Sequence, residues 1–252
     1  MNIDSASPPR SLRRICVPLS WAMLLWLLLL PAAVRLCAQT GAVRPWLYFP
    51  APRGAGDVRT MVGVRLLTLP REIVEEEINK APALDGAVAI GLRGQTALHA
   101  QAILQYVTNH IRVGGKWTHR LGNFGIGAGY DIGIWFGFAD FEGFDNRGNG
   151  WTHYPQLLFG YDFGDVLLSL RGEVIWIQAM RTFVGENEIR STGNRIAGGS
   201  LMAVLEQPFW GNTHAALGVR LSLTEFHYQS WFAFSTFERK LLFSELILGI
   251  LL

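Results

Sequence analysis

The sequence is poor in cysteine and in charge. Its 252 residues include two cysteines, Cys16 and Cys37, and only 17% are charged, against about 25% in ordinary soluble domains. Half of the residues are hydrophobic, which excludes a disordered chain, because disordered segments are polar and charged. Residues 39–252 contain no cysteine. This part of the chain therefore has no disulfide framework, no thiolate metal site and no cysteine nucleophile.

The first 38 residues have the features of an export signal. Three arginines between positions 10 and 14 form a basic start, an uncharged apolar stretch covers 15–34, and the segment ends with the small residue Ala38. This pattern predicts a secretory signal peptide at 1–38 that is cleaved after Ala38. An uncleaved anchor is the alternative, because about 20 uncharged residues can span a bilayer. Cleavage would leave a nearly neutral chain, so we expect no nucleic-acid partner.

Residues 39–56 are rich in proline and glycine and are predicted to form an N-terminal tether or a short docking segment. Beyond them the dominant pattern has a period of two. Between Asn123 and Ala139, bulky apolar residues occupy the even positions and glycines occupy most odd ones. A helix would scatter these glycines around its circumference, each at a cost of about 1 kcal/mol relative to alanine. In a β-strand they share one face, opposite the bulky residues.

The same alternation recurs in ten segments. We predict strands at 58–68, 84–94, 97–107, 110–120, 123–139, 153–162, 165–180, 196–207, 212–225 and 240–252. Short turns separate some of them, and long loops are predicted at 69–83, 140–152, 181–195 and 226–239. Short turns at one rim and long loops at the other are typical of transmembrane barrels. We therefore expect residues 57–252 to form an all-β, up-and-down antiparallel transmembrane β-barrel of about 10 strands, with 8 strands as the alternative.

Alternation alone does not separate a membrane barrel from a soluble one, which would bury its apolar phase. Here the phase that contains Phe124, Ile134 and Phe138 is bulky and apolar, whereas the opposite phase is mostly glycine, which fits a crowded interior. Strands of about 10 residues or more also match a tilted span of the hydrocarbon core. We expect the bulky phase to face lipid. Five aromatic residues fit interfacial girdles near the rims, namely Trp117, Trp151, Phe209, Trp210 and Trp231.

The export signal and the alternating strands resemble small bacterial outer-membrane β-barrel proteins. The resemblance covers most of 58–252 and is one of pattern rather than of motif. It implies a place in the Gram-negative outer membrane, contact with outer-membrane lipid including lipopolysaccharide, and insertion by the barrel assembly machinery. Such proteins commonly end in an aromatic residue, whereas this chain ends in Leu252.

Seven charged residues belong to the inward phase at a similar height in the predicted barrel. They are Asp85, Arg112, Asp131, Arg171, Glu173, Arg220 and Glu245. Isolated charges are costly in a narrow interior, so we expect these residues to pair in a network. Ten strands lie between the eight of side-chain-filled barrels and the sixteen or more of open porins. We therefore predict a largely plugged lumen and a structural or surface-interaction role. A narrow channel or a transporter of small lipophilic molecules is the alternative.

A second alternative is an enzyme that acts on lipid A or phospholipid. His227, Ser230 and Glu238 could form an acyl-transfer site, with histidine as base, serine as nucleophile and glutamate as the orienting group. Outer-membrane lipid A deacylases, as a family, carry the histidine and serine two positions apart on a strand, whereas here they are three apart. A strand would place them on opposite faces, so the site requires a loop or a bulge. We expect no cofactor and no metal site, because the histidines lack the spacing of metal ligands.

Overall fold

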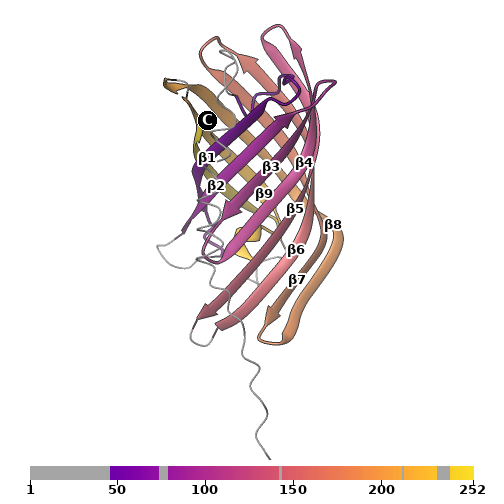
Figure 1. The fold of residues 1–252 in the computed structure, drawn as a ribbon. Helices are drawn as coiled ribbons and strands as arrows, with labels where there is room; N and C mark the ends of the chain where they lie inside the picture. The colour runs from indigo at the N-terminus through magenta and orange to yellow at the C-terminus, as the bar shows by residue number, and fades with distance from the viewer. Residues whose placement is uncertain (1–45, 74–78, 142–143, 212, 232–238) are drawn as a thin grey trace, which may run out of the picture. The chain divides into compact units, whose positions relative to one another are not determined.

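The computed structural model describes residues 46–73, 79–141, 144–211, 213–231 and 239–252. They form ten β-strands and a 3-10 helix, η1 (Tyr228–Ser230). The strands are β1 (Val58–Thr68), β2 (Lys80–Gly91), β3 (Thr96–Leu104), β4 (Thr108–Leu121), β5 (Phe124–Phe141), β6 (Phe144–Asp162), β7 (Leu167–Val184), β8 (Asn187–Trp210), β9 (Thr213–Thr224) and β10 (Leu241–Leu251). Neighbouring strands pair antiparallel, and β1 also pairs with β10, which closes the barrel (Figure 1). The predicted ten-stranded, up-and-down antiparallel barrel is confirmed.

The outer face of the barrel is apolar. In β5, Phe124, Ile134 and Phe138 expose 58%, 38% and 37% of their surface, whereas Asp131 and Trp135 on the opposite face are completely buried. Inward glycines leave room for large neighbours, because a Cβ on Gly133 would lie 2.6 Å from His110 Nε2. This is the arrangement of a barrel surrounded by lipid and the reverse of a soluble one.

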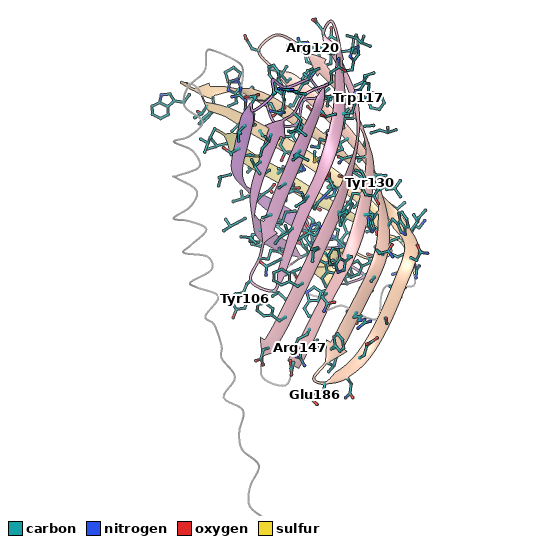
Figure 2. The ribbon with its side chains drawn as sticks, turned by 45° about the vertical axis from the view of Figure 1, so that its right-hand side comes forward. Tyr106, Trp117, Arg120, Tyr130, Arg147 and Glu186 are labelled. Carbon is teal, nitrogen blue, oxygen red and sulfur yellow. The ribbon has the colours of Figure 1, made fainter. Side chains whose placement is uncertain are left out.

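The two rims of the barrel differ. The β2–β3, β4–β5, β6–β7 and β8–β9 connections meet at one end, which we call the turn rim; the opposite end, with the β1–β2 and β9–β10 connections, is the loop rim. Strands β5–β8 have 18, 19, 18 and 24 residues, against 9 to 14 in the other six. Their outer ends, residues 136–141, 144–150 and 179–194, form an extension of the loop rim. Figure 2 shows Arg147 and Glu186 at its far end, beyond Tyr106 of the β3–β4 connection.

Two of the predicted long loops are wrong. The described residues of 140–152 belong to β5 and β6, and 181–195 belongs to β7 and β8 apart from a turn at Gly185 and Glu186. Gly185 has a φ of 59°, which glycine adopts without strain. Asn146 is buried and Arg147 is exposed, so both faces of the extension carry polar residues here. Polar residues on both faces make the alternation in this part of the extension weak.

Four of the five residues predicted for an aromatic girdle are exposed. Trp117, Trp151, Phe209 and Trp210 are exposed on the barrel, but Trp231 is completely buried, and its girdle assignment is wrong. The β9–β10 connection carries Trp231 into the barrel instead of along the rim. The predicted signal peptide lies outside the described residues. Within the ranges that are described, the structure holds no helix of the length and apolarity required to cross a membrane.

Candidate functional site

Glu173 of β7 binds three arginines from different parts of the barrel wall. Its Oε1 lies 2.7 Å from Nη2 of Arg112 and 3.1 Å from Nε of Arg171. Its Oε2 lies 2.7 Å from Nη2 of Arg220, and Ser200 donates its hydroxyl to the same oxygen at 3.0 Å. Because β4, β7 and β9 are not neighbours in the ring of strands, this carboxylate connects the walls across the lumen.

Arg112 of β4 joins a second carboxylate to this cluster. Its Nη2 lies 2.9 Å from Oδ2 of Asp131, and its guanidinium carbon lies 4.0 Å from the centre of the Tyr154 ring, within the range of a cation–π contact. Arg112, Asp131 and Glu173 are all buried. A buried charge is tolerated only with well-placed partners, so this cluster satisfies the main condition for placing charges in the lumen.

A separate cluster is organised by Arg65 of β1. Its Nε lies 2.6 Å from Oδ2 of Asp85, and its Nη1 lies 2.9 Å from Oε2 of Glu245. Gln101 donates to the other oxygen of Asp85 at 2.9 Å. The other oxygen of Glu245 lies 3.0 Å from Nε2 of His227. The two clusters together hold four arginines and four carboxylates.

The structure therefore distributes the seven charges named from the sequence over two clusters. The first contains Arg112, Asp131, Arg171, Glu173 and Arg220, and the second contains Asp85 and Glu245. Sequence analysis missed Arg65, which links the members of the second cluster. The signal was present, because Arg65 stands between the exposed Val64 and the partly exposed Leu66 in an alternating strand, and that phase points it inward.

The β9–β10 connection folds into the barrel from the loop rim. We call its described inward part, residues 225–231, the loop plug. Phe226, Tyr228 and Trp231 are buried there, and Trp231 donates its indole N–H to the hydroxyl of Thr108 at 2.8 Å. A Cβ on Gly148 would lie 2.8 Å from the Trp231 ring. The missing side chain of Gly148 therefore leaves room for the Trp231 ring on the inner face of the extension.

Residues 46–53 enter the lumen near the turn rim, and we call them the N-terminal plug. The backbone amides of Leu47, Tyr48 and Phe49 donate to the carboxylate of Glu206 on β8 at 2.6, 3.0 and 2.9 Å. Arg53 donates Nη2 to the backbone carbonyls of Trp46 and Leu47 at 2.7 and 3.0 Å. Burial lowers the pKa of Arg53 to about 10, so the side chain remains charged at neutral pH. The described part of the predicted tether is therefore packed against the inner wall.

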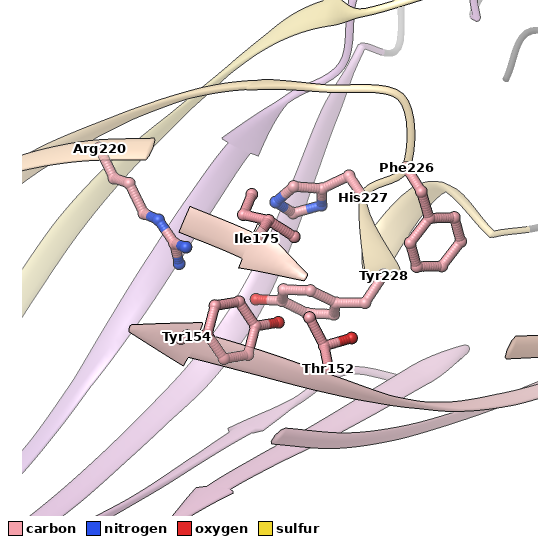
Figure 3. A pocket seen from close by; sticks show the side chains of 7 residues that line it. All are labelled: Thr152, Tyr154, Ile175, Arg220, Phe226, His227 and Tyr228. Carbon is pink, nitrogen blue, oxygen red and sulfur yellow. The ribbon is translucent and has the colours of Figure 1, made fainter. Parts of the chain in front are cut away.

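Little space remains between these elements. A cavity of about 10 Å³ lies between the loop plug and Arg220 (Figure 3). It is lined by Thr152, Tyr154, Ile175, Arg220, Phe226, His227 and Tyr228. A second cavity, of about 20 Å³, lies beside the N-terminal plug. About 10–15 Å³ accommodates one water molecule, so neither cavity admits a lipid or a drug-sized ligand.

The two described residues of the predicted acyl-transfer site, His227 and Ser230, are not arranged as a base and its nucleophile. His227 Nδ1 accepts a hydrogen bond from the backbone N–H of Gln229 at 3.3 Å, and Nε2 faces Glu245. Ser230 donates its hydroxyl to the backbone carbonyl of His227 at 3.0 Å, and not to the imidazole. Glu238 lies outside the described residues. Burial lowers the pKa of His227, against the opposing effect of Glu245. A neutral imidazole bonded at both nitrogens cannot activate Ser230 in this arrangement.

No protein-family model and no curated protein matches the sequence. The outer membrane protease OmpT from Escherichia coli is 10% identical, with a TM-score of 0.50 over 77% of this chain and 95% of that one. The neisserial surface protein A is 12% identical, with a TM-score of 0.38 over 79% and 99%. The translocator domain of the autotransporter NalP from Neisseria meningitidis is 10% identical, with a TM-score of 0.40 over 92% and 96%. At 10% identity, the likeness to OmpT shows a shared β-barrel fold and nothing of activity.

Proposed function

We propose that this protein is an exported outer-membrane barrel with a closed lumen, whose role is structural or in surface interaction. The observation that carries the proposal is the contact of Glu173 with arginines from β4, β7 and β9. Ion pairs that cross the lumen at this level oppose a continuous water-filled path. The loop plug and the N-terminal plug occupy the lumen on either side of this cluster.

Location in the outer membrane follows from the same proposal. The apolar outer face, with exposed residues such as Val64, Leu217 and Leu248, suits a lipid environment. The predicted cleaved signal peptide at 1–38 would supply export. Outer-membrane lipid including lipopolysaccharide would surround the barrel, and the barrel assembly machinery would insert it.

The extension is the candidate contact surface. Arg147 and Arg181 on its outer face and Glu186 at its end are exposed and polar, whereas Phe136 and Phe138, closer to the rest of the barrel, are exposed and apolar. Paired strands hold this surface more rigidly than free loops would, because its backbone amides and carbonyls are already engaged in the β5–β8 ladders. A rigid polar surface beyond the membrane is suited to recognition by other molecules at the cell surface.

Planar-bilayer recording tests the closed lumen. The purified full-length protein is expected to give no steady open-channel current, and an open porin inserted under the same conditions serves as the control. A reproducible single-channel conductance would contradict the closed lumen and would favour the narrow-channel alternative. Heat-modifiable mobility in gels of outer-membrane fractions tests location and fold together. A compact SDS-resistant form in that fraction is expected, and its absence there would contradict the proposal.

A further inference from the structure

The cavity beside the N-terminal plug is lined by cationic and apolar groups. Its polar lining includes the side chains of Arg53, His99, Lys116 and Thr118, which come from the plug, β3 and β4. The described residues that line it include no carboxylate. The volume of about 20 Å³ is close to that needed by one or two water molecules or one monatomic ion.

Several donors around this cavity lack partners. Arg53 uses Nη2 for the carbonyls of Trp46 and Leu47, but its buried Nη1 has no hydrogen-bond partner. The completely buried Nδ1 of His99 has none either, and its distance of 3.8 Å from Asp131 Oδ2 is too long for a hydrogen bond. Among the residues that the structure describes, no ion pair includes Lys116, whose side chain is partly buried.

The nearby carboxylates are already engaged. Glu206 accepts three backbone hydrogen bonds from residues 47–49. Asp131 is paired with Arg112 at 2.9 Å. Arg53 and, when protonated, Lys116 therefore place two positive charges beside one small cavity whose described lining contains no carboxylate. In surroundings of low polarity such charges repel each other strongly, and an anion placed between them removes the repulsion.

We propose that this cavity binds one small inorganic anion of halide size, which bridges Arg53 of the N-terminal plug to Lys116 and His99 of the barrel wall. The size of the cavity selects a monatomic anion over sulfate or a carboxylate-bearing metabolite. The absence of a lining carboxylate selects an anion over a cation. The ion would fasten the N-terminal plug to β3 and β4, on the side of the plug away from its Glu206 contact.

Bromide is the probe that tests this site. Crystals of the full-length protein grown in sodium bromide are measured at the bromine absorption edge, and one anomalous peak is expected between Arg53, His99 and Lys116. The variants Lys116→Met and Arg53→Gln should each abolish that peak. Arg53 lies outside the strands, so Arg53→Gln leaves a folded barrel even if Lys116→Met does not fold. Lys80→Met, at an exposed position, is the matched control and should keep the peak.

Unfolding in urea gives an independent measurement in solution. Chloride should raise the midpoint of the wild-type and Lys80→Met proteins in a saturable way, relative to gluconate at equal ionic strength. The same titration should leave Arg53→Gln unchanged. A wild-type cavity without a bromide peak, or a peak that persists in both Arg53→Gln and Lys116→Met, would overturn the proposal. An identical chloride response in the wild type and Arg53→Gln would also overturn it.

Discussion

Arg65 and Glu245 lie 2.9 Å apart inside the barrel, although 180 positions separate them in the sequence. Arg65 belongs to β1 and Glu245 to β10, the first and last strands, which pair along the seam that closes the ring. The same arginine holds Asp85 of β2 at 2.6 Å. The inner ion pairs therefore reinforce the backbone hydrogen bonds at the seam.

Replacing Arg65 with methionine should destabilise the barrel. Asp85 and Glu245 would lose their shared cation while remaining buried, and breaking a buried pair costs about 3–5 kcal/mol. The free energy of unfolding in urea, measured in detergent or lipid, is the readout. Arg147→Met is the control, because Arg147 is exposed and its nearest carboxylate oxygen, on Asp145, is 3.9 Å away. Equal stabilities of the two variants would show that the seam cluster contributes nothing.

Replacing Glu206 with alanine should release the N-terminal plug. The three amides of residues 47–49 would lose their acceptor, and each net hydrogen bond contributes about 1 kcal/mol. Trypsin should then cut after Arg53 under conditions where the wild-type protein is resistant, which mass spectrometry of the fragments detects. Glu188→Ala, at an exposed position of the same strand, should leave Arg53 protected. Protection of Arg53 in Glu206→Ala would refute the anchoring role.

Replacing Gly137 with alanine should displace the loop plug. The added Cβ would collide with the Trp231 ring, which is enclosed by the extension. Overpacking of this kind typically costs about 1–3 kcal/mol. The double variant Gly137→Ala, Trp231→Ala should lose less stability than the sum of the single changes. Gly86→Ala is the control, since a Cβ there would meet nothing within 4 Å. Strict additivity of the two changes would mean that the predicted collision does not occur.

Replacing Leu246 with lysine should test the position of the membrane. Leu246 is exposed on the outer face of β10, opposite Val219 and Leu66. A lysine at the lipid midplane costs about 2–4 kcal/mol, and a lysine outside the hydrocarbon costs little. Ile189→Lys, on the exposed end of the extension, should therefore be almost neutral. The free energy of unfolding in lipid vesicles is measured for both variants. An equal loss of stability in the two would indicate that the apolar belt includes the extension.

The fold was predictable because lipid on one side and a crowded lumen on the other impose a strict period of two. Phe124, Ile134 and Phe138 face outward as their spacing predicts. The pattern weakened where both faces of a sheet meet polar surroundings, so residues 181–195 were predicted as a loop although they continue β7 and β8. Local alternation therefore indicates what surrounds a strand more directly than it indicates whether a strand is present.

The lumen was predictable only in part. The phase of each strand identifies residues such as Asp131 and Glu173 as inward, but it does not determine which partner each one meets across the barrel. Trp231 resembled a rim aromatic because its inward path depends on space left by Gly137 and Gly148, which are distant in sequence. The proximity of His227 and Ser230 in the sequence likewise gave no indication that Ser230 would bond to the backbone of His227 instead of its ring.

The contact between Phe49 and Glu206 constrains the order of biogenesis. The two residues are 157 positions apart, so the hydrogen-bond acceptor of residues 47–49 emerges only after most of the chain has been synthesised. The N-terminal segment is therefore synthesised early, whereas its hydrogen-bond acceptor is present only after β8 has been made. It can reach its final position only after β8 has formed.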